Sequence, residues 1–349
     1  MVTQEIVMQA LSTVIEPELH RDLVSLNMIR NLEIKNGRDL SFTIMLTTPA
    51  CPLRGKMEGD CRAALAAVPG LGQITVNFDA NISSNRRISD QIGQNFKHAI
   101  AVASGKGGVG KSTVSVNLAI ALAQMGASVG LLDADILGPN VPMMMGKQTM
   151  PPPHERKLTP AENYGVKFIS MAFLSDPSKP MIWRGPMLHS AIRQLLVDVS
   201  WGELDYLIVD LPPGTGDAQL SLAQTLPLTG AVIVTQPMAV AAMDALRGLK
   251  TFEQLNVPIL GVVENMSGEL FGTGAGEILA QQNNTAYFGS IPLEARVRMG
   301  GDEGHPVVAA YPNSAAAKAF VHVAQQIAAR ISVITLTNQA NFIPISMVN

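Results

Sequence analysis

The residues with the clearest chemical potential lie in the run SGKGGVGKST, at positions 104–113. Gly105 to Ser112 fit the spacing G-x-x-x-x-G-K-[ST], after an apolar run typical of a buried strand and before a helical pattern. In that setting the N–H groups of a glycine-rich turn converge at a helix N-terminus and bind phosphate oxygens. The alternative is a glycine-rich turn that binds nothing, and the flanking strand and helix favour phosphate binding.

Each position of this loop has an expected role in holding ATP. Lys111 would contact the β- and γ-phosphates, Ser112 would ligate Mg²⁺, and Thr113 would reach the α-phosphate. Nucleotide binding is therefore assigned to Gly105, Lys106, Gly107, Gly108, Val109, Gly110, Lys111, Ser112 and Thr113.

Carboxylates follow two other apolar runs. Asp210 ends YLIVD, the Walker B arrangement, in which the carboxylate holds Mg²⁺ through water. Asp133 and Asp135 end LLDAD, and residues two apart on a strand point to the same side. Asp133 is assigned to Mg²⁺, and Asp135 to orienting or deprotonating the attacking water. The alternative for this pair is an ordinary strand end followed by turn residues.

The loop holds a second lysine, Lys106, which a phosphate-binding loop does not require. Its place in the first turn is awkward for reaching the γ-phosphate of the same subunit. A second subunit placed face to face could insert it where negative charge develops, which makes Lys106 a catalytic candidate. The alternative is a solvated surface lysine.

The elements that position these residues alternate in type along the chain. Short apolar runs such as HAIAVAS, SVGLLDAD, YLIVDLP and GAVIVTQP are typical of strands buried on both faces, and helical patterns separate most of them. This predicts an α/β, P-loop NTPase domain over residues 98–332, with a mostly parallel sheet between helices.

The first 80 residues differ from this pattern. Alternating runs flank Asn36-Gly37, a strong hairpin signal, and LRGKMEGDCRAALAAV is helical. We expect a small α+β domain over residues 1–80 and a polar linker over 81–97. Residues 333–349 follow the closing helix as a tail without an assigned role.

Composition narrows the class of protein. The chain has 349 residues and a formal net charge of −3 without a long basic run, which argues against binding nucleic acid. No apolar stretch reaches the roughly 18 residues of a membrane span, and the N-terminal residues do not read as a signal peptide. Two cysteines cannot form a disulfide framework, which is typical of a reducing compartment. Together these features predict a cytoplasmic protein without a membrane partner.

Several motifs carry a resemblance to a known family. GKGGVGKST, DADILGPN and DLPPGTGD resemble the deviant Walker A ATPases. Within that group VVENMSG and GSIPLEARVRMGGDEGHPVV look closest to the Mrp/ApbC iron–sulphur cluster carriers, over almost the whole chain. The N-terminal LVSLNMIRNLEI and LTTPACPL are similar to a small iron–sulphur assembly domain.

The resemblance implies a homodimeric ATPase that transfers iron–sulphur clusters to apo-proteins and works with cluster scaffold proteins. It places Asp135 in switch I and Asp210 in switch II, with Lys106 acting across the dimer. It also implies that Asn265 recognises adenine and that Pro292 lies near the base. From the residues alone, Asn265 is equally an ordinary turn residue.

The chain departs from that family at the cluster ligands. The usual C-x-x-C after ENMS is absent, so the four-thiolate [4Fe–4S] bridge between two subunits cannot form in the usual way. Cys51 precedes Pro52, the expected first residue of a helix, and Arg54 and Lys56 are close. A thiol there would have a lowered pKa and could ligate a shared cluster, or it is a small buried residue. Cys61 reads as core.

The missing C-x-x-C leaves a second hypothesis open. The chain could act as a positioning or regulatory switch, like the partition and division ATPases, without binding a cluster. Such proteins usually add a basic DNA-binding surface or a membrane-binding helix, and residues 334–349 contain neither lysine nor arginine.

Overall fold

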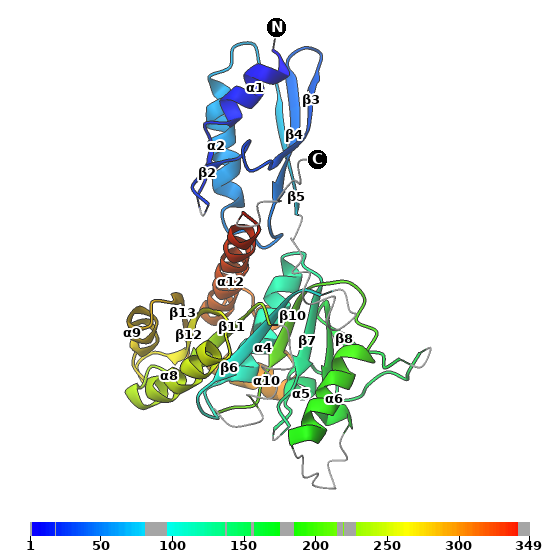
Figure 1. The fold of residues 1–349 in the computed structure, drawn as a ribbon, viewed down its shortest axis with the longest axis vertical. Coiled ribbons are helices and arrows are strands. Elements are labelled where there is room, and N and C mark those ends of the chain that lie inside the picture. The colour runs from blue at the N-terminus through cyan, green and yellow to red at the C-terminus, as the bar shows by residue number, and fades with distance from the viewer. Residues whose placement is uncertain are drawn as a thin grey trace, which may run out of the picture. The chain divides into compact units, whose positions relative to one another are not determined.

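The computed structural model describes two compact units. It covers residues 2–17, 19–80, 96–136, 138–154, 157–174, 185–214, 219 and 228–340. One unit consists of Met1–Ser83 with Ala328–Asn349, and the other of Ser84–Ile327 (Figure 1). The boundary between the units on the C-terminal side falls inside the last helix, α12 (Ala315–Ala340), whereas the expected nucleotide-binding domain extended to residue 332.

The larger unit is built on one sheet. Among the described residues it has eight strands in the order β13-β12-β11-β6-β10-β7-β9-β8, and neighbours run parallel except β8 and β9. Their bounds are β6 (Phe96–Ser104), β7 (Val129–Asp133), β8 (Ala161–Asn163), β9 (Val166–Ser170), β10 (Leu204–Asp210), β11 (Gly230–Thr235), β12 (Ile259–Ser267) and β13 (Ala286–Pro292). The expected α/β fold is confirmed.

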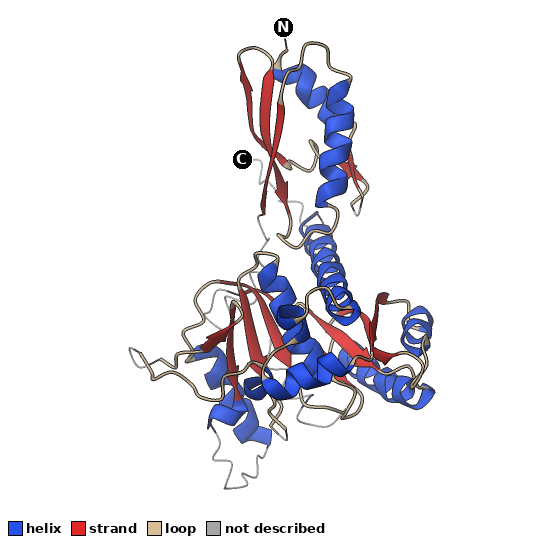
Figure 2. Ribbon diagram, turned by 180° about the vertical axis from the view of Figure 1, so that it is seen from behind, coloured by secondary structure: helices blue, strands red, loops and turns tan. Residues whose placement is uncertain are grey.

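Helices cover both faces of this sheet (Figures 1 and 2). The described helices of this unit are α4 (Lys111–Gln124), α5 (Val141–Met144), α6 (Gly185–Val197), α8 (Ala239–Gln254), α9 (Ala275–Gln282), α10 (Ala295–Glu303), α11 (Val307–Ala310) and the first part of α12, with a 3₁₀ turn over Met171–Leu174. The helix after the phosphate loop, α4, contacts β6, β7 and β10. The loop is thus anchored to the central strands.

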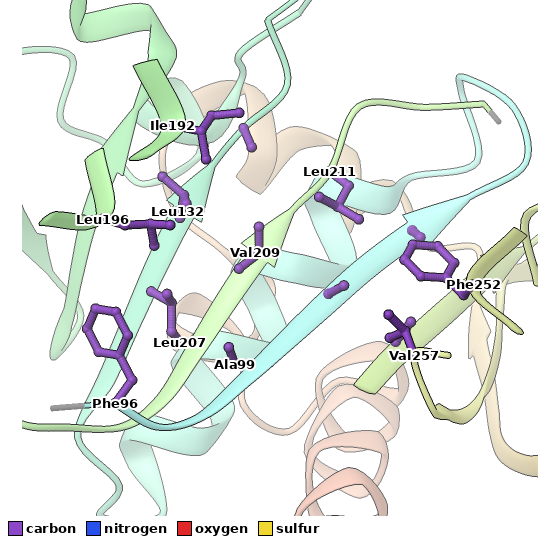
Figure 3. Close-up of a cluster of buried hydrophobic side chains, with 14 of the residues drawn as sticks. Phe96, Ala99, Leu132, Ile192, Leu196, Leu207, Val209, Leu211, Phe252 and Val257 are labelled. Carbon is purple, nitrogen blue, oxygen red and sulfur yellow. The ribbon is translucent and has the colours of Figure 1, made fainter. Parts of the chain in front are cut away.

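The strands are apolar because both of their faces are buried. Every residue of β7 and of β11 is buried, as expected for parallel strands between helices. On one face, Ile192 of α6 packs with Leu132 and Val209, and Phe252 of α8 joins the same cluster (Figure 3). This packing fixes the positions of the strand ends, and the polar side chains at those ends lie close together as a result.

The smaller unit is an α+β fold. In the part that the structure describes, its sheet has the order β3 (Ile29–Lys35), β4 (Asp39–Leu46), β5 (Ile74–Ala80). A hairpin joins β3 and β4 through Asn36 (φ 53°) and Gly37 (φ 69°), the left-handed pair that the Asn-Gly signal predicts. Helix α2 (Arg54–Ala66) connects β4 to the parallel β5, α1 (Gln4–Leu11) contacts α2, and β1 (Ile15–Glu16) pairs with β2 (Arg21–Asp22).

Three expected boundaries need correction. Strand β6 begins at Phe96, inside the linker expected over 81–97, because its ring is buried edge-to-face against Trp201. The last helix continues to Ala340 and takes up residues 333–340 of the expected tail, since no glycine or proline interrupts the sequence there. Helix α2 begins at Arg54, two residues after Pro52. Linker residues 81–95 and tail residues 341–349 lie outside the described residues.

None of the described helices is long and apolar enough to cross a membrane.

Candidate nucleotide site and cysteine positions

The phosphate loop joins β6 to α4 with a backbone that glycine permits. Gly108 and Gly110 have φ of 80° and 83°, in the left-handed region where a side chain is strained. At Gly105 a Cβ atom would lie 2.0 Å from the backbone carbonyl carbon of Asp244 in α8. The first glycine is therefore required by close packing against α8, and the other two by the turn.

The outer side of the same loop has room for a ligand. A Cβ at Gly107 would meet no described atom closer than Cγ of Pro213 at 4.0 Å, and one at Gly108 would meet none within 4 Å. Val109 is buried and anchors the loop, while Lys106 is half-buried and its carbonyl oxygen accepts a hydrogen bond from Ser104 at 3.0 Å. This open glycine face fits phosphate oxygens approaching the loop N–H groups.

A hydrogen-bonded network surrounds Asp210 at the end of β10. Its fully buried carboxylate accepts hydrogen bonds from Ser112 Oγ at 2.6 Å on Oδ2 and from Ser115 Oγ at 2.6 Å on Oδ1. Lys111 Nζ lies 2.8 Å from Oδ1. The expected convergence of loop lysine, loop serine and strand-end carboxylate is present in the structure.

The neighbouring strand adds two carboxylates. Asp133 of β7 is in register with Asp210, and the Asp135 carboxylate lies 3.6 Å from Lys111 Nζ. Asp133 is fully buried and accepts hydrogen bonds from Ser170 Oγ at 2.7 Å and from the N–H groups of Asp135 at 3.2 Å and Val141 at 3.3 Å. Burial and the nearby Asp210 charge raise the pKa of Asp133 to about 8, against the effect of these hydrogen bonds. Asp133 thus holds the segment that carries Asp135, and its expected role toward Mg²⁺ stays a prediction.

The other candidate residues lie at the ends of β12 and β13. Asn265 is buried and its amide Nδ2 donates to the Val109 carbonyl oxygen at 2.9 Å, so it contacts the phosphate loop. Pro292 ends β13, in register with Ser267. The roles of Asn265 and Pro292 toward adenine stay predictions.

Two residues that line this site were missed by sequence reasoning. Ser115 lies one helical turn after Lys111 and bonds to Asp210, a spacing that could have been noticed. Gln236, just after β11, donates to the Gly108 carbonyl oxygen at 3.5 Å and to the Met266 sulphur at 3.0 Å. No local sequence signal identifies that contact.

The two cysteines have different surroundings in the smaller unit. Cys51 is half-buried and lies three residues before the start of α2, so it does not directly precede the first helical residue as expected. Arg54, expected near the thiol, places its guanidinium 4.4 Å from the centre of the Phe78 ring. Cys61 is fully buried in α2, where burial first, and then Asp60 and Glu58, raise the pKa of its thiol to about 12. Its interpretation as core is confirmed.

Comparison with known proteins identifies the family. Residues 95–328 match the NUBPL iron-transfer P-loop NTPase family, and residues 4–78 match the family described as iron-sulfur cluster assembly protein. The chain belongs to the iron-transfer P-loop NTPases. The resemblance to iron–sulphur cluster carriers found from the motifs is confirmed.

Several known proteins match this chain over most of their own length. Iron-sulfur cluster carrier proteins of Synechocystis sp. and Deinococcus radiodurans are each 50% identical, over 96% and 97% of this chain and 100% and 98% of theirs. An ADP-bound nucleotide-binding protein from Archaeoglobus fulgidus is 36% identical with a TM-score of 0.54, over 63% of this chain and 90% of its own. The cell division ATPase MinD of Pyrococcus furiosus is 23% identical with a TM-score of 0.52, over 66% and 98%, and shows the shared fold.

Proposed function

We propose that this protein is a Mg²⁺-dependent ATPase that carries iron–sulphur clusters in the cytoplasm and transfers them to apo-proteins as a homodimer. The single observation that carries the proposal is one chain holding both a complete nucleotide-site network and an iron–sulphur assembly unit. Relatives that match it from end to end are named iron–sulphur cluster carriers. The likeness to MinD concerns the fold and does not favour a positioning switch.

The donor set suits ATP with Mg²⁺. Ser112 Oγ and the Asp210 carboxylate would hold the ion, which neutralises phosphate charge when bound. Lys111 would exchange its contacts with Asp210 and Asp135 for the β- and γ-phosphates. Asp135 is then positioned to orient the attacking water and accept its proton, while Asp133 holds the Asp135 backbone.

Adenine recognition is proposed for the ends of β12 and β13. Because Asn265 Nδ2 already donates to Val109, its Oδ1 is the atom suited to accept from the exocyclic amino group of adenine. Guanine presents a carbonyl oxygen at that position, so the same atom would discriminate against GTP. Pro292 would lie against the base.

Lys106 is proposed to act in the active site of the partner subunit. Two inactive variants test this: Lys106→Ala lacks the inserted cation, and Asp135→Asn lacks the group that orients water. In a mixed dimer, one site combines the intact Asp135 of one subunit with the intact Lys106 of the other. Mixing the two variants should therefore restore hydrolysis to a substantial fraction of the wild-type rate. No recovery, with mixed dimers demonstrated by native mass spectrometry, would refute action in trans.

Cys51 is proposed to bind the cargo, a [4Fe–4S] cluster shared between subunits. A cluster generally needs four ligands, so two copies of Cys51 would be completed by non-cysteine ligands or by the recipient protein. Reconstitution with iron and sulphide without oxygen should give bound iron and transfer to an apo-protein. Cys51→Ala should abolish both, whereas Cys61→Ala should retain both because that thiol is inside the core. A wild-type protein that acquires no cluster would refute the carrier function.

A further inference from the structure

We propose that Ser115 is a positioning residue that holds the Walker B carboxylate, Asp210, in the orientation needed to bind Mg²⁺. The inference rests on the proposed ATPase function and assigns a task within that site to a residue outside the phosphate-loop motif. Ser115 lies in α4, one turn beyond Lys111, and its side chain is fully buried.

The hydroxyl of Ser115 has two acceptors within reach and one proton to donate. Its Oγ lies 2.6 Å from Asp210 Oδ1 and 3.1 Å from the carbonyl oxygen of Lys111, four residues earlier in the same helix. A charged acceptor at the shorter distance makes the stronger hydrogen bond. The hydroxyl proton of Ser115 therefore points to the carboxylate of Asp210, which is 95 residues away in the sequence.

The other two donors to Asp210 have further duties once a nucleotide binds. Lys111 is expected to contact the phosphates, and Ser112 is expected to ligate the metal ion. Of the three, Ser115 is the one outside the phosphate-loop motif, with no expected contact to the phosphates or the ion, and its side chain is fully buried, so it can hold Asp210 with and without nucleotide.

The two oxygens of Asp210 are also divided between the serines. Ser115 donates its hydrogen bond to Oδ1, and Ser112, the expected metal ligand, donates to Oδ2. Fixing Oδ1 from inside the protein directs Oδ2 toward Ser112 and sets the carboxylate rotation. Groups that orient a metal-binding carboxylate typically affect metal affinity 10–100-fold, roughly, when they are removed.

The test measures ADP binding calorimetrically across a Mg²⁺ titration. In Ser115→Ala we expect the Mg²⁺ concentration at half-maximal enhancement of ADP affinity to rise about 10–100-fold. ADP affinity in EDTA should stay within about twofold of wild type, because the loop N–H groups are unchanged. Ser115→Thr, which keeps the hydroxyl, should return the Mg²⁺ dependence to near the wild-type value.

A matched control and a backup variant make the outcome decisive. Thr335→Ala removes a helix hydroxyl that donates at 2.8 Å to the carbonyl oxygen of Ile331 four residues earlier, away from the nucleotide site, and should leave the titration unchanged. If Ser115→Ala does not fold, Ser115→Cys supplies a weaker donor of similar shape and should shift the titration in the same direction. A wild-type titration with folded Ser115→Ala or Ser115→Cys would overturn the inference. Absence of Mg²⁺-dependent ADP binding in the wild type would instead refute the proposed ATPase function.

Discussion

The nucleotide unit and the small unit differ in the groups that surround their candidate functional residues. Around Asp210, two serine hydroxyls and one lysine lie within 2.8 Å of a single buried carboxylate. Around Cys51 the neighbours that line a small cavity are mostly apolar, including Met28, Leu46 and Met57. The first arrangement is a complete network within one chain. The second offers a single thiol, which suits a ligand that is completed by another molecule.

The architecture explains the difference. Parallel strands deliver their carboxyl ends to one edge of a sheet, so β7 and β10 place Asp133 and Asp210 in register. The small sheet pairs one antiparallel and one parallel neighbour with β4, and its core is formed by apolar side chains of both helices and the strands. Cys51 instead lies half-buried on the connection between β4 and α2, away from any edge where strand ends bring several carboxylates together.

The largest effect is expected from Lys111→Ala. Its side chain is 6% exposed and neutralises Asp210, which is 0% exposed, as well as Asp135. Losing a cation aimed at the transferred phosphate should lower kcat by about 10²–10³-fold. Leaving the buried carboxylates unpaired should also cost about 3–5 kcal/mol of the free energy of unfolding in the nucleotide-free protein. Steady-state hydrolysis and urea denaturation measure the two effects.

Lys250→Ala is the matched control for that experiment. Lys250 forms a surface ion pair with Glu253 at 2.8 Å in α8, so its removal should change the free energy of unfolding by less than about 1 kcal/mol. Both tryptophans of the chain, Trp183 and Trp201, belong to the nucleotide unit, so tryptophan fluorescence reports the unfolding of that unit. Equal losses of stability in the two lysine variants would contradict the network described around Asp210.

Thiol chemistry separates the two cysteines of the small unit. Burial raises the pKa of Cys61 to about 12, so its thiol stays protonated as the pH rises through the range where accessible cysteines ionise, near 8.5. At pH 8, iodoacetamide should modify it about 10³-fold more slowly than an accessible cysteine. Native protein should therefore be alkylated once, at the half-buried Cys51, and urea-unfolded protein twice. Peptide mass spectrometry identifies the site, and early labelling of Cys61 would contradict the core assignment.

The sequence predicted the nucleotide site better than the cysteine site. Residues 105–112 and Asp210 follow local spacing rules, and parallel strands converge by a general rule, so their meeting could be foreseen. Ser115 was overlooked although it follows Lys111 by one helical turn, whereas the Gln236 contact with Gly108 spans 128 residues and has no local signal. Such contacts depend on how α4 and the strand ends pack together.

The type of fold was predicted correctly, but several boundaries of helices and strands were not. Alternating apolar runs predicted the parallel sheet, and Asn36-Gly37 predicted the hairpin. Pro52 suggested a helix start, whereas Leu53 is the N-cap without a capping side chain, so no local signal marks the true start at Arg54. The continuation of α12 past Ile331 was likewise missed, although that segment contains no helix-breaking residue.

Two glycines of the phosphate loop differ in what they tolerate. A Cβ at Gly105 would overlap the α8 backbone at Asp244, so Gly105→Ala should lower the free energy of unfolding by about 1–3 kcal/mol or more. Gly107 faces open space, so Gly107→Ala should change the free energy of unfolding of the nucleotide-free protein by less than about 0.5 kcal/mol. Urea denaturation followed by tryptophan fluorescence compares the two variants. Similar losses in both would mean that the loop is not held against α8.

The smallest effect is expected from a polar contact of the small unit. Arg62 in α2 pairs with Glu58 at 2.9 Å, with side chains 45% and 35% exposed, and also donates to the Ile74 carbonyl oxygen at 3.0 Å. Solvent screens such a pair, so Arg62→Ala should reduce stability by about 0.5–1 kcal/mol, far less than loss of Lys111. The small unit has no tryptophan or tyrosine, so hydrogen exchange of peptides from β4 and β5 is the suitable measurement. A loss of several kcal/mol would show that this unit, too, depends on a polar network.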